Sequence, residues 1–401
     1  MLWDALTLQL GYNATLVAIG ATLLGFAAGV TGTFLFLRKR ALVSDAISHA
    51  TLPGVCIAFM VMVALGGEGR NLPGLLAGSA LSAGLGLLCI NGLTRRTRLA
   101  EDAAIGAVLS VFFGFGVVLL TVIQTMGVGR QAGLEGFLLG STAGMLFADA
   151  LIIAVGGAAT VLLVMILRRP MLMVAFDAEY AAATGLPVHR VDLAMMGLVM
   201  AVTVIGLKIV GLILIVALLI IPPVTARFWS DRADRVVLLS GIAGGLAGYL
   251  GAAVSASAPN LPTGPIIVLI SFALFALSLL LAPVRGVLAA VLRHRRFQRR
   301  VHVRQGLLAL AQGQEVYEPY TRRLLRRAGL MRADGVATDA GRARAAKALR
   351  DERRWGLVRA DQMHEAAAAQ YDGLRDIETV LTRDQIDEID RRIGPPHEVR
   401  A

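Results

Sequence analysis

An aspartate and a histidine lie four residues apart near the start of a long apolar segment. They are Asp45 and His49, within the stretch RKRALVSDAISHATLPG at residues 38–54. Four residues make about one helical turn, so both side chains lie on the same face of a helix. A carboxylate and an imidazole on an apolar helix usually face a cavity, where together they can hold a divalent cation. The pair therefore predicts a metal path lined by Asp45 and His49.

The same residues also fit a purely structural role at the start of a helix. Ser44 could cap the helix, Asp45 could favour its positive N-terminal end, and His49 could simply be hydrogen-bonded. The dipeptide Pro53-Gly54 favours the metal path, because proline disturbs the helix and frees carbonyl groups next to His49. Helix interruptions of this kind are typical of ion routes.

The composition indicates a membrane protein. The 401 residues are 56% hydrophobic and 17% charged, with a mean hydropathy of +0.68. These values exclude an ordinary soluble domain and predict several membrane spans. Cys56 and Cys89 lie in apolar runs and form no disulfide framework. The start of the chain lacks a basic region, so we expect no cleavable signal peptide.

Nine apolar segments are long enough, or nearly so, to cross a bilayer as a helix, which takes about 20 residues. Their limits are 14–37, 46–66, 72–92, 103–124, 147–167, 191–207, 209–226, 236–256 and 262–282. Only Lys208 separates the sixth from the seventh, which predicts a tight hairpin or a broken helix. The glycines spaced along residues 241–248 predict close helix packing. We therefore expect an all-α polytopic membrane protein with about nine transmembrane helices, eight or ten being the alternatives.

The basic residues predict the orientation of these spans. With nine spans, nearly all of the basic residues between and after them fall on one side: Arg38, Lys39, Arg40, Arg95, Arg96, Arg98, Arg168, Arg169, Arg190, Arg227, Arg232, Arg235, Arg293, Arg295 and Arg296. Only Arg70, Arg130 and Lys208 fall on the other. The positive-inside rule then places the N-terminus outside and the C-terminal part in the cytoplasm.

The C-terminal part has the composition of a water-soluble domain. Residues 285–401 carry 24 basic and 16 acidic side chains and no long apolar run. We expect a transmembrane domain at 1–285, a basic linker at 286–300 and a small cytoplasmic winged-helix-like α(+β) domain at 301–401. Helices are predicted at 305–312 and 319–328, and a β-hairpin at 329–338. Thr338, with Asp339, is placed to cap the next helix.

Three stretches together resemble the metal-uptake ABC permeases, a family that imports manganese, zinc or ferrous iron. Residues 41–54 look like the family signature, and the stretch FDAEYAAATGLP at 176–187 is similar to its cytoplasmic coupling helix. The stretch KIVGLILIVALLIIPP at 208–223 resembles a further family segment. The resemblance covers residues 10–285 in order and spacing, and it implies that Asp45 and His49 line the metal pathway.

The resemblance also implies partners. The coupling segment would meet a groove on an ATP-binding cassette subunit through Phe176, Asp177, Glu179, Tyr180 and Gly185. None of the three lysines lies in a phosphate-binding G-x-x-x-x-G-K-[ST] loop, so ATP hydrolysis belongs to that separate subunit and the chain is not an enzyme. We expect an extracytoplasmic metal-binding protein, a second permease subunit (identical or related) and membrane lipid as further partners, in a bacterial inner membrane. We expect no permanently bound cofactor. The cargo is Mn²⁺, Fe²⁺ or Zn²⁺, and the resemblance of residues 301–401 to iron- and manganese-dependent repressors favours manganese or iron.

Residues 301–401 resemble the winged helix and dimerisation region of iron- and manganese-dependent repressors. Possible metal ligands there are His364, Glu365 and Glu378. The arginine-rich helix at 319–328 could meet DNA phosphates, but we expect docking against the transporter and do not expect nucleic acid as a partner. Two other functions stay open: a membrane-tethered, metal-responsive DNA-binding regulator, and a permease for a larger metal chelate such as haem or cobalamin.

Overall fold

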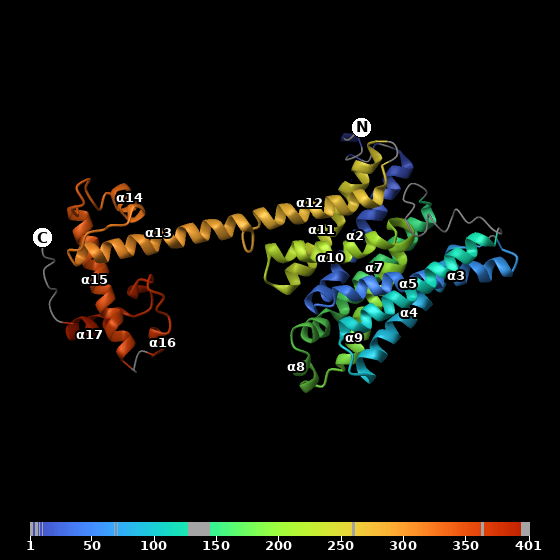
Figure 1. Ribbon diagram of the computed structural model, residues 1–401, viewed down its shortest axis with the longest axis horizontal. Helices are drawn as coiled ribbons and strands as arrows, with labels where there is room; N and C mark the ends of the chain where they lie inside the picture. The colour runs from blue at the N-terminus through green and yellow to red at the C-terminus, as the bar shows by residue number, and fades with distance from the viewer. Residues whose placement is uncertain are drawn as a thin grey trace. The chain divides into compact units, whose positions relative to one another are not determined.

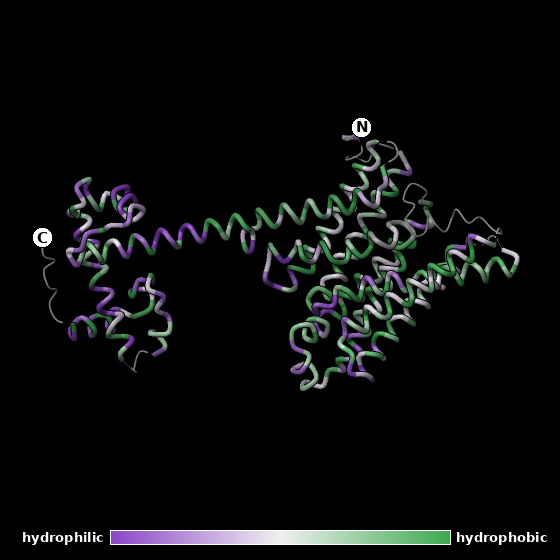
Figure 2. The backbone as a smooth tube through the Cα atoms, in the orientation of Figure 1, coloured by the Kyte–Doolittle hydropathy of each residue, from purple (hydrophilic) through white to green (hydrophobic). Residues whose placement is uncertain are grey.

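The computed structural model describes residues 3–4, 7, 9, 11–67, 69, 71–126, 145–258, 261–361 and 365–393. The chain divides into two compact units, Met1–Leu288 and Ala289–Ala401 (Figure 1). Hydrophobic residues dominate the helices of the first unit, whereas hydrophilic residues are frequent in those of the second (Figure 2). The division at Leu288 falls close to the boundary at residue 285 predicted from composition.

Each of the nine predicted apolar segments coincides with a helix. The helices are α2 (Tyr12–Leu37), α3 (Ala41–Ala64), α4 (Leu72–Arg96), α5 (Glu101–Thr125), α7 (Phe147–Phe176), α9 (Val188–Val210), α10 (Leu212–Trp229), α11 (Ala233–Ala256) and α12 (Thr263–Leu281). In the described part of the chain, eight of them are long and apolar enough to cross a membrane. The exception is α10, whose apolar stretch is shorter and contains Pro222 and Pro223. The all-α polytopic fold is confirmed.

Among the helix boundaries that differ from the prediction, two have a direct physical cause. Helix α7 continues beyond residue 167 to Phe176, because Met171 and Val174 in its last turns are buried against the bundle. The break between α9 and α10 falls at Gly211 and not at Lys208. Gly211 has a φ of 79°, a conformation that glycine adopts without steric penalty, whereas the backbone at Lys208 remains helical.

Helix α2 lies at the centre of the first unit and packs against α7, α9, α10 and α11. Small residues bring α2 and α11 into backbone contact. A Cβ atom added at Gly25 would lie 2.2 Å from the carbonyl oxygen of Gly244, and one added at Gly248 would lie 2.2 Å from that of Ala21. Ser240 fixes the crossing by donating a hydrogen bond of 2.6 Å to the Gly29 carbonyl. The predicted close packing of the 241–248 glycines is confirmed.

The second unit is helical. Its elements are α13 (Val287–Ala311, whose first two residues belong to the first unit), α14 (Pro319–Arg327), α15 (Asp339–Ala360), α16 (Glu365–Ala368), the 3₁₀ helix η3 (Ile377–Thr379) and α17 (Arg383–Ile393). One apolar cluster gathers around Leu325 and another around Trp355, both fully buried. The segment expected as a basic linker is helical from Val287 onward.

The predicted hairpin at 329–338 consists, among the described residues, of one antiparallel bridge between Met331 and Ala337. Thr338 caps α15 as expected, since its hydroxyl accepts a hydrogen bond of 3.1 Å from the Gly341 amide. The helix–hairpin–helix order is therefore present, while the relation of this unit to winged-helix repressors stays a prediction.

Candidate metal-path site

Asp45 and His49 lie together on one face of α3. The Nε2 atom of His49 is 3.4 Å from Oδ1 of Asp45. The side chains are 39% exposed for Asp45 and 21% for His49, so the pair is open on one side and not enclosed between helices. An imidazole nitrogen and a carboxylate oxygen this close, with an open side, can both turn toward one divalent cation.

The capping alternative fails for Ser44. Helix α3 begins at Ala41, and the hydroxyl of Ser44 is buried and donates back to the Ala41 carbonyl at 2.6 Å. Asp45 therefore lies one turn inside the helix, beyond the amide groups that a capping carboxylate would meet. The nearby hydroxyls of Ser48 and Thr51 also bond to their own helix, at 2.8 and 2.6 Å. The charge of Asp45 has no helix-capping role.

Two further features shape the site around His49. Its Nδ1 atom is buried and has no hydrogen-bond partner among the described residues. Its ring contacts Phe113 of α5 edge-on, with 4.9 Å between ring centroids. Pro53, four residues later, has no N–H to offer, so the carbonyl oxygen of His49 lacks its usual helical partner. That carbonyl oxygen is a third possible ligand, in addition to the two side chains.

An ion-pair network holds the end of the bundle from which α3 starts. Asp192 of α9 accepts a hydrogen bond of 2.9 Å from Arg38 and lies 3.5 Å from Arg40. Arg38 also donates to the Val174 carbonyl at 3.0 Å, and Arg40 pairs with Glu101 at 2.7 Å. The network thus joins α2, α3, α5, α7 and α9. Sequence reasoning missed it, although an acidic residue in an apolar segment, as at Asp192, is a usable signal.

The predicted coupling segment forms a short, exposed helix. Phe176 ends α7 and is 66% exposed, and Tyr180 on α8 (Ala178–Ala183) is 59% exposed. The carboxylate of Asp177 accepts the Tyr180 amide at 2.8 Å, which caps α8, and Glu179 lies in the first turn. The apolar face expected for this helix is divided, because Ala181 is buried against the bundle while the two aromatic rings face outward.

Gly185 ends α8 in a Schellman motif. The amide of Leu186 donates to the Ala181 carbonyl at 3.1 Å, that of Gly185 donates to Ala182 at 3.0 Å, and Gly185 has a φ of 85°. The segment is therefore a defined, outward-facing element at the end of α7 and not an irregular loop.

The possible metal ligands of the tail are not gathered in the described part of the chain. Glu378 pairs with Lys347 at 3.2 Å, Glu365 starts α16, and His364 lies outside the described residues. Among those described, no group of three His, Cys, Asp or Glu side chains could hold a metal ion, in either unit. A tail metal site stays a prediction.

The first unit (Met1–Leu288), called the membrane unit below, is similar to membrane proteins of known transport systems. Residues 12–282 match the profile of the ABC 3 transport family. The chain is 40% identical over 320 residues to the manganese transport system membrane protein MntC of Bacillus subtilis, covering 80% of this chain and 71% of that protein. That stretch is longer than the first unit, so it reaches into the second. The zinc transport system membrane protein TroC of Treponema pallidum is 37% identical over 71% of this chain and 94% of its own.

The fold is also that of a solved permease. PsaBC from Streptococcus pneumoniae, in complex with Fab, matches with a TM-score of 0.61 and 30% identity over 71% of this chain and 98% of that one. Family profile, relatives and fold agree with the resemblance of residues 41–54, 176–187 and 208–223 to ABC permeases, whose ATPase is a separate subunit. This chain belongs to the ABC 3 transport family.

Proposed function

We propose that the chain is the membrane permease subunit of an ATP-driven importer of divalent transition-metal ions, manganese first and iron or zinc next. The observation that carries the proposal is the partly exposed Asp45–His49 pair on α3, in which His49 Nε2 lies 3.4 Å from Asp45 Oδ1. The names of the relatives, which are manganese and zinc transport system membrane proteins, support the class of cargo. Nitrogen and oxygen ligands suit all three metals.

One chain supplies too few ligands for such an ion. Zinc takes four ligands and manganese prefers six, mostly oxygen. Asp45, His49 and the His49 carbonyl provide at most three or four donor atoms, and no other acidic or imidazole group joins them in the described residues. A second permease subunit facing this pair would complete the coordination, which supports a dimer with the pathway between the two copies.

The ATP-binding subunit docks at α8. The exposed aromatic side chains of Phe176, at the end of α7, and Tyr180, on α8, are suited to fill a groove on a partner. The acidic residues Asp177 and Glu179 lie between them in sequence. The same end of the bundle carries the arginine-rich connections, and the positive-inside rule therefore supports a cytoplasmic position for this end and an N-terminus outside. An extracytoplasmic metal-binding protein delivers the ion on the opposite side of the bacterial inner membrane.

The second unit regulates or joins the transporter as a cytoplasmic module. The match to MntC extends into it, which supports a role shared with a transport protein. A metal bound by His364, Glu365 and Glu378 would make this module a sensor of the imported ion.

Metal uptake into vesicles tests the permease proposal. The complete transporter is reconstituted with wild type, Asp45→Asn or His49→Ala, and Asp231→Asn, an exposed ion-pair residue, is the control. We expect uptake to fall roughly 10- to 100-fold in the two site variants, the range in which loss of supporting groups lowers metal affinity. Equal uptake by all variants would remove the pair from the pathway, and it would favour a larger chelate as cargo.

A further inference from the structure

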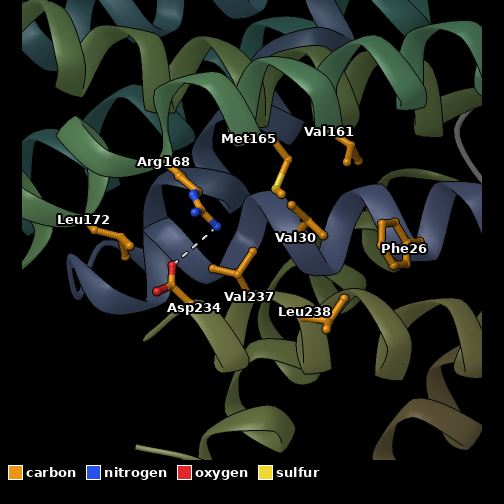
Figure 3. A pocket seen from close by; sticks show the side chains of 9 residues that line it. All are labelled: Phe26, Val30, Val161, Met165, Arg168, Leu172, Asp234, Val237 and Leu238. Atoms are coloured by element: carbon orange, nitrogen blue, oxygen red, sulfur yellow. Dashed lines mark ion pairs between the residues drawn. The ribbon is translucent and has the colours of Figure 1, made fainter. Parts of the chain in front are cut away.

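An apolar groove runs along α2 between α7 and α11 (Figure 3). Its volume is about 270 Å³. Phe26 and Val30 of α2 form the floor, Val161 and Met165 of α7 one wall, and Val237 and Leu238 of α11 the other. These six side chains, of the nine that line the groove, are apolar and lie in helices that can cross the membrane, so this part of the groove suits a hydrocarbon chain and not a polar solute.

The groove is open at the side and polar at one end. Met165 is 50% exposed and Leu238 57%, so the rims face away from the bundle. Figure 3 shows Arg168 and Asp234 facing each other toward one end, with Leu172 beyond them, and Phe26 at the other end. From Arg168 to Val161 is seven residues of helix, or about 10 Å. Because one leaflet supplies about half of a 30 Å hydrocarbon core, a chain in this groove would run from the polar boundary toward the bilayer centre.

The charge at the polar end favours an anionic headgroup. Arg168 lies 3.7 Å from Asp234, which is longer than a hydrogen bond, so its N–H donors remain available to a second acceptor. Arg169 and Arg235 are adjacent in sequence and exposed. The lining itself holds one arginine and one aspartate, and Arg169 and Arg235 add positive charge beside this pair. A guanidinium binds phosphate through paired hydrogen bonds.

The groove lies apart from the face that carries the candidate metal site. Helix α3, with Asp45 and His49, packs mainly on α4, α5, α9 and α10, whereas α7 and α11 flank α2. A second permease subunit that faces the metal site would leave the groove facing lipid. We propose that the groove binds an anionic phospholipid, with one acyl chain along α2 and the phosphate at Arg168. This site is independent of the transported ion.

Native mass spectrometry of the purified full chain tests this site. The protein is delipidated in mild detergent and offered equal amounts of phosphatidylglycerol and phosphatidylcholine. We expect wild type to retain phosphatidylglycerol preferentially, and Arg168→Gln to lower that preference about fivefold, as for the loss of one cationic contact to an anionic lipid. Val30→Trp and Met165→Trp should abolish retention because the indole fills the groove.

The control is Leu280→Trp, an equally exposed apolar position (51%) on α12, which should retain the lipid as wild type does. Val30 is buried, so Val30→Trp could prevent folding; Met165 lies at the exposed rim and decides the outcome in that case. Equal retention of the two lipids by wild type, or undiminished retention by Met165→Trp, would overturn the proposal. Loss of a dimer without loss of lipid in Met165→Trp would also overturn it, because the occupant would then be a second copy.

Discussion

Replacement of Asp192 by asparagine should destabilise the membrane unit far more than the same change at an exposed ion pair. Asp192 and Arg38 are each only 17% exposed and 2.9 Å apart. The substitution removes a charge-assisted hydrogen bond, which contributes about 1.5–3 kcal/mol, and leaves two guanidinium groups less well compensated. Arg38 keeps its bond to the Val174 carbonyl and Arg40 keeps Glu101, which limits the loss. We therefore expect a destabilisation of about 2 kcal/mol.

The matched control is Asp231→Asn. Asp231 pairs with Arg285 at 2.6 Å, but the two side chains are 54% and 50% exposed. An exposed pair contributes about 0.2–1 kcal/mol, so the control should lose much less stability. Thermal unfolding of the purified proteins in one detergent provides the comparison. At about 2–4 °C per kcal/mol for a domain of 150–250 residues, Asp192→Asn should lower Tm by about 4–8 °C. A Tm no lower than that of Asp231→Asn would refute the argument that burial makes this network stabilising.

Two further predictions concern helix packing and pH. In α11, Gly244→Ala should destabilise the bundle strongly, because the added Cβ would lie 2.1 Å from the Gly25 carbonyl oxygen. Gly245→Ala should be tolerated, since the atom nearest to its added Cβ is 3.5 Å away. The Tm values of the two variants provide the test, and equal values would contradict the packing of α2 against α11. In the second unit, the hydrogen bond from Arg354 holds the pKa of Asp390 below its ordinary value of 3.8. The stabilisation that this pair provides is therefore present above pH 3.8, and it is lost as pH falls through the lower pKa of the folded state. Amide exchange in α17 should therefore rise below pH 3.8 in wild type and change less in Asp390→Asn; the same acid response in both would be inconsistent with this role.

The membrane fold could be predicted because lipid imposes a simple rule on sequence. Apolar segments of about 20 residues must be helices there, and all nine segments are. The extension of α7 to Phe176 could not be predicted, since two arginines at 168–169 end the hydropathic signal while burial of Met171 and Val174 depends on distant helices. The break at Gly211 was within reach, because glycine is the residue that tolerates a positive φ.

The candidate site was predictable only in part. The proximity of Asp45 and His49 follows from helical spacing alone. Phe113 is 64 positions from His49, and Asp192 is 154 from Arg38, so no local pattern links them. Their contacts arise from the packing of α3 against α5 and of α9 against the end of α2, which single-sequence reasoning does not determine. The end of α8 at Gly185 was predictable, because Gly-Leu-Pro is a typical helix stop.

The position of a bound ion would show directly whether Asp45 and His49 hold the metal. Anomalous scattering from Mn²⁺ in crystals of the full permease would place the metal without relying on transport. We predict a peak within about 2.0–2.3 Å of both a carboxylate oxygen of Asp45 and a nitrogen of His49, as for transition-metal ligands in general. A manganese peak elsewhere in the membrane unit, with Asp45 and His49 bonded only to each other, would contradict it.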